Sequence, residues 1–200
     1  MFLPEARFLG RETDGSDACD GRGLPGELRS WLEDPQGGAM LHLACHATVR
    51  AGMGDQPTAF LLLADGQRLS AEELIDTLDA AEGRAVSLAV LAACSSAESG
   101  RGYDEAFSLA TALLTRETRS VISTQWSVSD AGTSVLMFMF HHFLREHGLR
   151  PSDALRAAQL WMIHDDDLPG SAPESVRATS TAPRSSSRLE VWAAFVHFGR

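Results

Sequence analysis

One segment, residues 88–98, constrains the fold most, because a short apolar run, Leu-Ala-Val-Leu-Ala-Ala, leads directly into Cys94 and then into small polar residues. An apolar run this short, bounded by turn residues, is typical of a buried strand in a parallel sheet. A second run of this kind, residues 40–44, is followed by Cys-His-Ala, in which the histidine is His46. Open α/β sheets place their active sites at the carboxyl ends of parallel strands. We therefore expect a thiol and an imidazole side by side.

Strands and helices alternate along the rest of the chain. Asp65-Gly66 between two apolar runs predicts a hairpin, and Ser70 with Glu73 forms a capping box that opens a helix. The predicted strands are 6–10, 40–44, 59–63, 67–69, 88–93, 119–124 and 190–198, and the predicted helices are 27–32, 70–81, 104–115, 130–146 and 151–163. This alternation indicates an α/β layered domain with a mainly parallel sheet.

Composition narrows the class of protein. Two hundred residues suffice for one substantial core, and the net charge of -10 argues against binding to nucleic acid or to anionic membrane surfaces. No apolar run approaches the roughly 20 residues of a membrane span. The first residues lack the basic and apolar regions of a signal peptide, and three cysteines are too few and too odd in number for a disulfide framework. We expect a cytoplasmic protein with reduced thiols.

Six sequence blocks, taken together and in order, resemble the CHAT domain, a member of the caspase-like cysteine peptidase clan that is related to separase and caspases. The spacing agrees, since His46 lies 48 positions before Cys94 (94 − 46) and the caspase histidine lies about 50 before its cysteine. The resemblance covers roughly residues 38–198. The blocks are LHLACHA at 41–47, FLLLADG at 60–66, LAAC at 91–94, SVISTQWSVSD at 120–130, PSDALRAAQL at 151–160 and VWAAFV at 191–196.

The resemblance implies a caspase-like three-layer α/β/α sandwich with a mainly parallel sheet and a shortened N-terminal part. It implies that residues 1–37 form a short N-terminal strand, loop and helix segment of the same domain. Residues 38–200 are then the CHAT-like catalytic domain. Within it, the Pro-, Ser- and Thr-rich stretch 165–187 predicts a flexible linker.

The resemblance also implies roles for single residues. His46 would be the general base and Cys94 the nucleophile, and the backbone N–H groups of Ala47 and Cys94 would form the oxyanion hole. The implied activity is cleavage of a protein or peptide substrate in a regulated, signalling or defence role, with no metal or organic cofactor. A TPR-containing or other regulatory partner is implied too. The groove for an extended substrate would be lined by Gln125, Trp126, Ser127 and Asp130.

Departures from the family pattern keep other readings open. Ala47 stands where the family has glycine, Ser95-Ser96 where it has Glu-Thr, and about 38 residues precede the histidine strand where two strand–helix units are usual. These differences motivate the alternative of a catalytically inactive CHAT-type interaction module. His42 and His46 with Cys45 suggest a metal site, although side chains alternate along a strand. A doubly wound small-molecule binder would need a Gly-rich phosphate loop, which we do not find.

Overall fold

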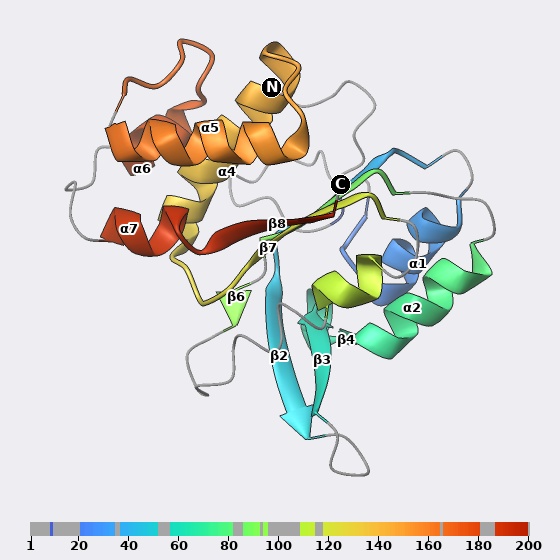
Figure 1. The fold of residues 1–200 in the computed structure, drawn as a ribbon. Coiled ribbons are helices and arrows are strands. Elements are labelled where there is room, and N and C mark those ends of the chain that lie inside the picture. Colours follow the sequence, from blue (N-terminus) through green and yellow to red (C-terminus); the bar gives the residue numbers. More distant parts are fainter. Residues whose placement is uncertain are drawn as a thin grey trace.

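The computed structural model describes most of the chain and places it in two sheets with helices around them (Figure 1). At positions 49–51, 57–58, 94–95, 180 and 187–188 only the backbone is described. The described residues are 9, 21–34, 37–51, 57–81, 86–92, 94–95, 109–114, 118–164, 166–180 and 187–199. Of the expected first strand, 6–10, only residue 9 is described; residues 104–108 and 115 of an expected helix, and 165 and 181–186 of the expected linker, also lie outside the described part of the chain.

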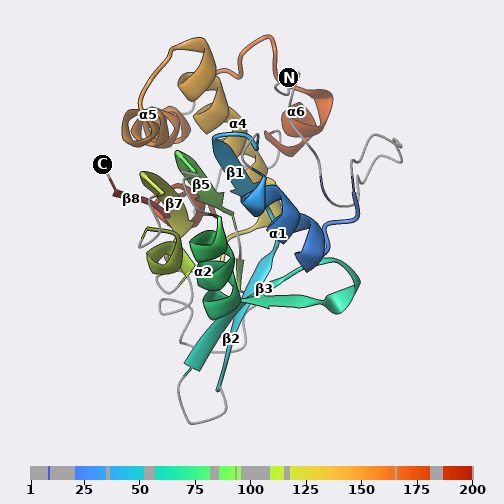
Figure 2. The ribbon, with the colours of Figure 1, turned by 90° about the vertical axis from the view of Figure 1, so that its right-hand side faces the viewer.

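The main sheet has the strand order β1-β5-β7-β8. Its first three members, β1 (Met40–Leu43), β5 (Leu88–Leu91) and β7 (Ser120–Thr124), are parallel, and β8 (Phe195–Gly199) is antiparallel to β7. Figure 2 shows these strands side by side. β5 is buried at every position, as expected for a central strand covered on both faces. The predicted mainly parallel α/β fold is therefore correct.

A second four-stranded sheet has the order β4-β3-β2-β6, and its strands β2 and β3 extend away from the main sheet as the long hairpin of Figure 1. β2 (His46–Ala51) pairs antiparallel with β3 (Pro57–Leu62), and β3 pairs antiparallel with β4 (Arg68–Ser70). β6 (Cys94–Ser95) joins β2 in parallel. The expected Asp65-Gly66 turn is present, with positive φ values of 57° and 69°, which Asp and Gly tolerate.

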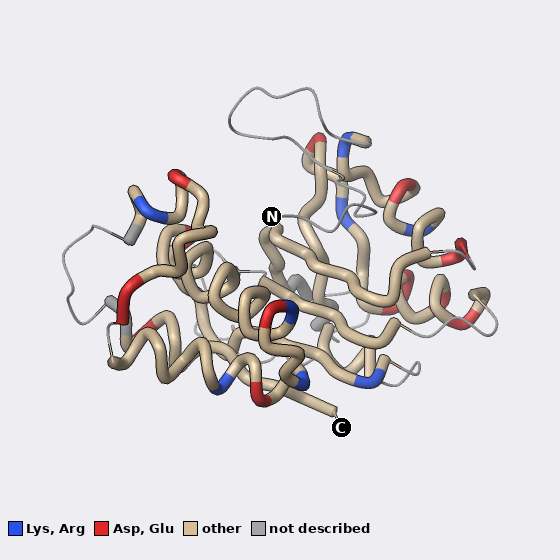
Figure 3. Tube along the Cα trace, turned by 90° about the horizontal axis from the view of Figure 1, so that it is seen from above, with Lys and Arg blue, Asp and Glu red and all other residues tan. Residues whose placement is uncertain are grey.

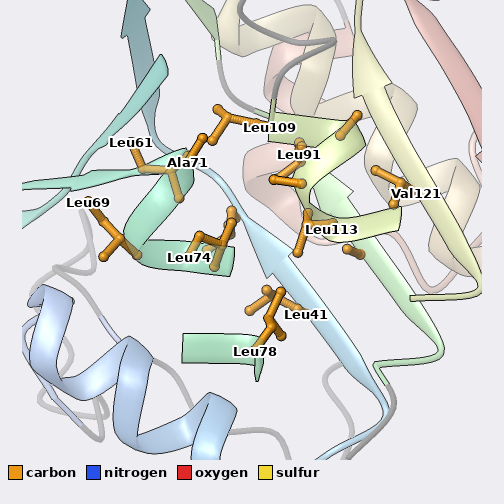
Figure 4. Close-up of a cluster of buried hydrophobic side chains, with 14 of the residues drawn as sticks. Leu41, Leu61, Leu69, Ala71, Leu74, Leu78, Leu91, Leu109, Leu113 and Val121 are labelled. Carbon is orange, nitrogen blue, oxygen red and sulfur yellow. The ribbon is translucent and has the colours of Figure 1, made fainter. Parts of the chain in front are cut away.

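One face of the main sheet is covered by α1 (Pro25–Glu33), α2 (Ala71–Ala80) and the helical residues 109–114. The capping box predicted for α2 is formed, because Ser70 Oγ accepts from Glu73 N at 3.0 Å and Glu73 Oε2 accepts from Ser70 N at 2.9 Å. This core also takes in the second sheet, so the two sheets share one apolar interior (Figure 4). Its members include Leu41, Leu61, Leu69, Leu74, Leu78, Leu91, Leu109, Leu113 and Val121.

The other face of the main sheet is covered by α4 (Asp130–Glu146), α5 (Pro151–His164) and α7 (Ser187–Trp192). Side chains alternate between the two cores along each strand: Ala89 and Leu91 enter the first, Leu88 and Val90 the second. The three layers of an α/β/α sandwich follow. Leu136, Met139, Phe140, Ala158 and Phe195 are almost fully buried in this second core.

Three predicted elements differ in the structure. The Gly-rich stretch 50–57 is expected to be a loop, but Arg50 and Ala51 continue β2, because they pair with Thr58 and Pro57 of β3. The strand expected from 190 begins only at Phe195, because residues 187–192 form α7. Within the expected linker, Glu174–Ser180 forms α6, whose Arg177 donates to the carbonyl oxygens of Pro169, Gly170 and Ala172.

Charged residues are spread over the outer helices on both sides of the sheet (Figure 3). Among the residues the structure describes, no helix is long and apolar enough to cross a membrane.

No group of three or more His, Cys, Asp or Glu side chains in the described ranges is placed to hold a metal ion.

Candidate active site

The site begins where two neighbouring strands leave the main sheet together. β1 and β5 are paired up to Leu43 and Leu91, and the pairing runs one residue further, because Ala92 N donates to Leu43 O at 2.9 Å. The segments that follow β1 and β5 then enter the second sheet and pair with each other again as β2 and β6. The Cα partners in this new parallel pair are His46 with Cys94 and Ala47 with Ser95.

This register brings the two predicted catalytic residues to adjacent positions. Neighbouring strands lie about 4.8 Å apart, and residues in register share a face of the sheet. His46 is exposed, so its face of β2 is open to solvent. The side chain of Cys94 is outside the described part of the chain, and its backbone places position 94 beside position 46.

Ala47 faces the opposite way. Its side chain is 4% exposed and belongs to the first core, together with Leu61, its partner on β3. The extra methyl group, relative to the glycine of the family pattern, is therefore accommodated among apolar residues and lies on the opposite face of β2 from the exposed His46.

Cys45 is a second thiol next to the candidate site, and its environment is apolar. It packs against the first core, between the two sheets, and burial raises the pKa of its thiol to about 12. A thiol with this pKa is almost entirely protonated at neutral pH and is a poor nucleophile. Cys45 is therefore a structural residue, in agreement with the alternation of side chains along the chain.

The predicted substrate-binding segment follows β7 at the same carboxyl edge of the parallel strands. Gln125, Ser127 and Asp130 are exposed there. Trp126 is half-buried, and its indole Nε1 donates to the carbonyl oxygen of Glu190 at 2.7 Å. The structure thus presents three of the four predicted residues to solvent and directs the N–H of the fourth toward α7.

A pair of histidines near the site was missed by the sequence reasoning. His42 Nδ1 of β1 lies 3.1 Å from His141 Nε2 of α4. Although part of the His42 side chain is exposed, loss of hydration in its surroundings lowers its pKa to about 4. Burial lowers the pKa of His141 to about 3, and the charges of His42 and Arg145 add to that shift. The alternation of His42 with buried Leu41 and Leu43 could have placed it on the α4 face, but no local pattern indicates which helix residue it meets.

Comparison with known families gives one finding. The family model described as CHAT domain matches residues 18–200, nearly the whole chain. No curated protein matches this chain.

Proposed function

This chain belongs to the CHAT domain family, and from that premise we propose that it is a cysteine endopeptidase in which His46 and Cys94 form the catalytic dyad. The observation that carries the proposal is the parallel register, which makes these two residues Cα partners in β2 and β6. A thiol needs a base within hydrogen-bond reach to become a nucleophile, and adjacent backbone positions on neighbouring strands support such an arrangement.

The proposed reaction has two halves. His46 takes the proton from the Cys94 thiol, the thiolate attacks the peptide carbonyl carbon, and the imidazolium gives its proton to the leaving amine as the C–N bond breaks. A water molecule, deprotonated by His46, then attacks the thioester, releasing the carboxylic acid and restoring the thiol. Backbone N–H groups near Ala47 and Cys94 would stabilise the oxyanion.

Two features of the surroundings support this assignment. The neighbouring thiol, Cys45, is half-buried with its pKa raised to about 12, so it would compete poorly with Cys94 for the substrate. The exposed residues Gln125, Ser127 and Asp130 follow the adjacent strand β7 and would contact an extended substrate. We propose a protein or peptide as that substrate, in a regulated or signalling pathway.

The decisive experiment exposes the protein to a peptide library and identifies cleavage products by mass spectrometry. We expect Cys94→Ala to lower turnover by roughly 10³-fold or more while the protein still unfolds in one cooperative transition. Cys45→Ala, which removes the buried thiol one residue from His46, serves as the control and should retain turnover. Absence of cleavage by the wild-type protein across all residue types before the scissile bond, with and without TPR-containing partners, would favour the non-catalytic interaction module instead.

A further inference from the structure

The short helix α7 has an unusual end. A helix leaves its last four carbonyl groups without partners inside the helix, and each needs another donor. In α7 the backbone supplies two of these: Ala193 N donates to Leu189 O and Ala194 N to Val191 O. The other two donors are side chains from distant parts of the sequence.

Those two side chains are Trp126 and Gln159. Trp126 Nε1 donates to Glu190 O at 2.7 Å, and Gln159 Nε2 donates to Trp192 O at 2.8 Å. Gln159 Nε2 also lies 2.9 Å from Phe195 O, the first residue of β8. The end of α7 is therefore completed by the segment after β7 on one side and by α5 on the other.

The segment after β7 makes two more contacts, one with Ala194 just after α7 and one with Val191 of α7. Gln125 N donates to Ala194 O at 2.8 Å. Gly132, in the first turn of α4, approaches Val191 so closely that a Cβ atom there would collide with Val191 Cγ2. The segment 125–130 thus has contacts with the α7 region at its first two residues, Gln125 and Trp126, and Gly132 adds one just after its end.

We infer that Trp126 is a positioning residue, whose hydrogen bond to α7 fixes the conformation in which Gln125, Ser127 and Asp130 face the substrate. The inference rests on the proposed function and deepens it. The bond spans 64 positions of sequence, so α7 controls a segment to which it is not adjacent in the chain. The indole N–H is already used by Glu190 O, and the exposed residues Gln125 and Asp130 lie on either side of Trp126 in this segment.

Trp161 offers a matched control. Its Nε1 also donates to a backbone carbonyl oxygen, that of Asp167, at 3.2 Å, and its ring packs in the same core on α5. Trp126→Phe and Trp161→Phe therefore each remove one indole donor and a similar volume. If either Phe variant fails to fold, replacement of the same tryptophan by 3-benzothienylalanine keeps the shape and removes only the N–H.

The test uses peptidyl electrophiles that alkylate Cys94, with iodoacetamide as a probe that needs no groove. For Trp126→Phe we expect about a fivefold weaker apparent affinity for the peptidyl probe, the size of one lost hydrogen bond, with the iodoacetamide rate nearly unchanged. Trp161→Phe should show neither effect. Equal changes in both variants, or none in Trp126→Phe, would overturn the inference.

A second readout does not depend on activity. Hydrogen–deuterium exchange of the backbone amides at 125–130 should become faster in Trp126→Phe and stay the same in Trp161→Phe. If iodoacetamide reacts with the wild-type protein at least as fast as every peptidyl probe does, the proposed function fails. Hydrogen–deuterium exchange then still tests the contact between Trp126 and α7. Unchanged exchange in Trp126→Phe would show that α7 does not fix the segment, whatever the activity.

Discussion

His46 and Cys94 are paired at the same offset that pairs Met40 with Leu88 in the main sheet, 48 positions in each case (94 − 46 and 88 − 40). The two neighbouring segments, β1 followed by β2 and β5 followed by β6, therefore keep the same parallel register as they pass from the main sheet into the second sheet. The relative position of the two site residues is consequently set by the pair β1–β5, in which Leu41, Leu43, Ala89 and Leu91 all enter the first core. A shift of one residue there would turn every side chain to the opposite face.

Replacement of His46 by alanine tests the proposed base directly. Because His46 is exposed, we expect a change of no more than about 0.5 kcal/mol in the free energy of unfolding. Loss of a general base lowers turnover by about 10²- to 10⁴-fold. Cleavage kinetics and urea denaturation of the same preparation separate the two quantities, with His147→Ala, at an exposed histidine after α4, as the control. Full turnover by His46→Ala would exclude the proposed role.

Thiol labelling should separate the cysteines. Burial raises the pKa of Cys45 to about 12, so at pH 7 to 8 its thiolate fraction is negligible and alkylation in the folded protein should be slow. We expect iodoacetamide to modify Cys94 first, and both residues at similar rates in denaturant. Peptide mapping by mass spectrometry reads each site separately. Equal labelling of Cys45 and Cys94 in the folded state would contradict an activated Cys94.

Much of the fold could be predicted because its determinants are local. The helix α2 begins where Ser70 and Glu73 can cap it, and the hairpin turns at Asp65-Gly66, where positive φ is tolerated. The central strand β5 is an unbroken apolar run, as a strand buried on both faces must be. In these elements the residues next to one another in sequence supply the deciding contacts.

The elements that escaped prediction depend on distant residues. β2 extends into the Gly-rich stretch 50–57, which has the composition of a loop, because Arg50 and Ala51 pair with residues of β3. Residues 187–192 form a helix whose end is completed by Trp126 and Gln159, and neither partner is visible in the local pattern. For the site, the sequence predicted both His46 and Cys94 as neighbours, and their catalytic roles remain a prediction.

Stability should depend on pH through the His42–His141 pair. Both pKa values are lowered in the folded protein, to about 4 and about 3, so the folded state binds fewer protons than the unfolded state below pH 6.5. The free energy of unfolding therefore falls as the pH drops from about 6.5 toward 4, and levels off only below the folded-state values. Burial also lowers the pKa of His197, which adds to the loss in the same direction.

Urea denaturation at a series of pH values measures this slope. His141→Gln should make it shallower without abolishing it, because His197 remains. Loss of hydration, more than charge repulsion, is the largest cause of both shifts, so about 0.5 M salt should leave most of the slope in place. A slope that is equal in wild type and His141→Gln would show that the pair does not contribute.

The contact between Gly132 and Val191 predicts that Gly132→Ala changes the free energy of unfolding in opposite directions when residue 191 is valine and when it is alanine. In the wild-type protein, Gly132→Ala places a methyl group against Val191 Cγ2, and overpacking of this kind costs about 1–3 kcal/mol. Alanine is the better helix former by up to about 1 kcal/mol, which is too little to offset the collision. Gly132→Ala should therefore destabilise the protein.

In a Val191→Ala background the colliding Cγ2 is absent. The next neighbours of the added methyl group, Ser129 Oγ and the Cβ of residue 191, both lie at 3.2 Å and need to shift by only a few tenths of an ångström, so the helix propensity of alanine outweighs them. Gly132→Ala should then stabilise the protein by up to about 1 kcal/mol relative to Val191→Ala alone. A double-mutant cycle by urea denaturation measures both effects, and the coupling energy is their difference. The same sign of effect in both backgrounds would mean that Val191 Cγ2 does not oppose a side chain at position 132. Segment 125–130 would then be held by the Trp126–Glu190 and Gln125–Ala194 bonds.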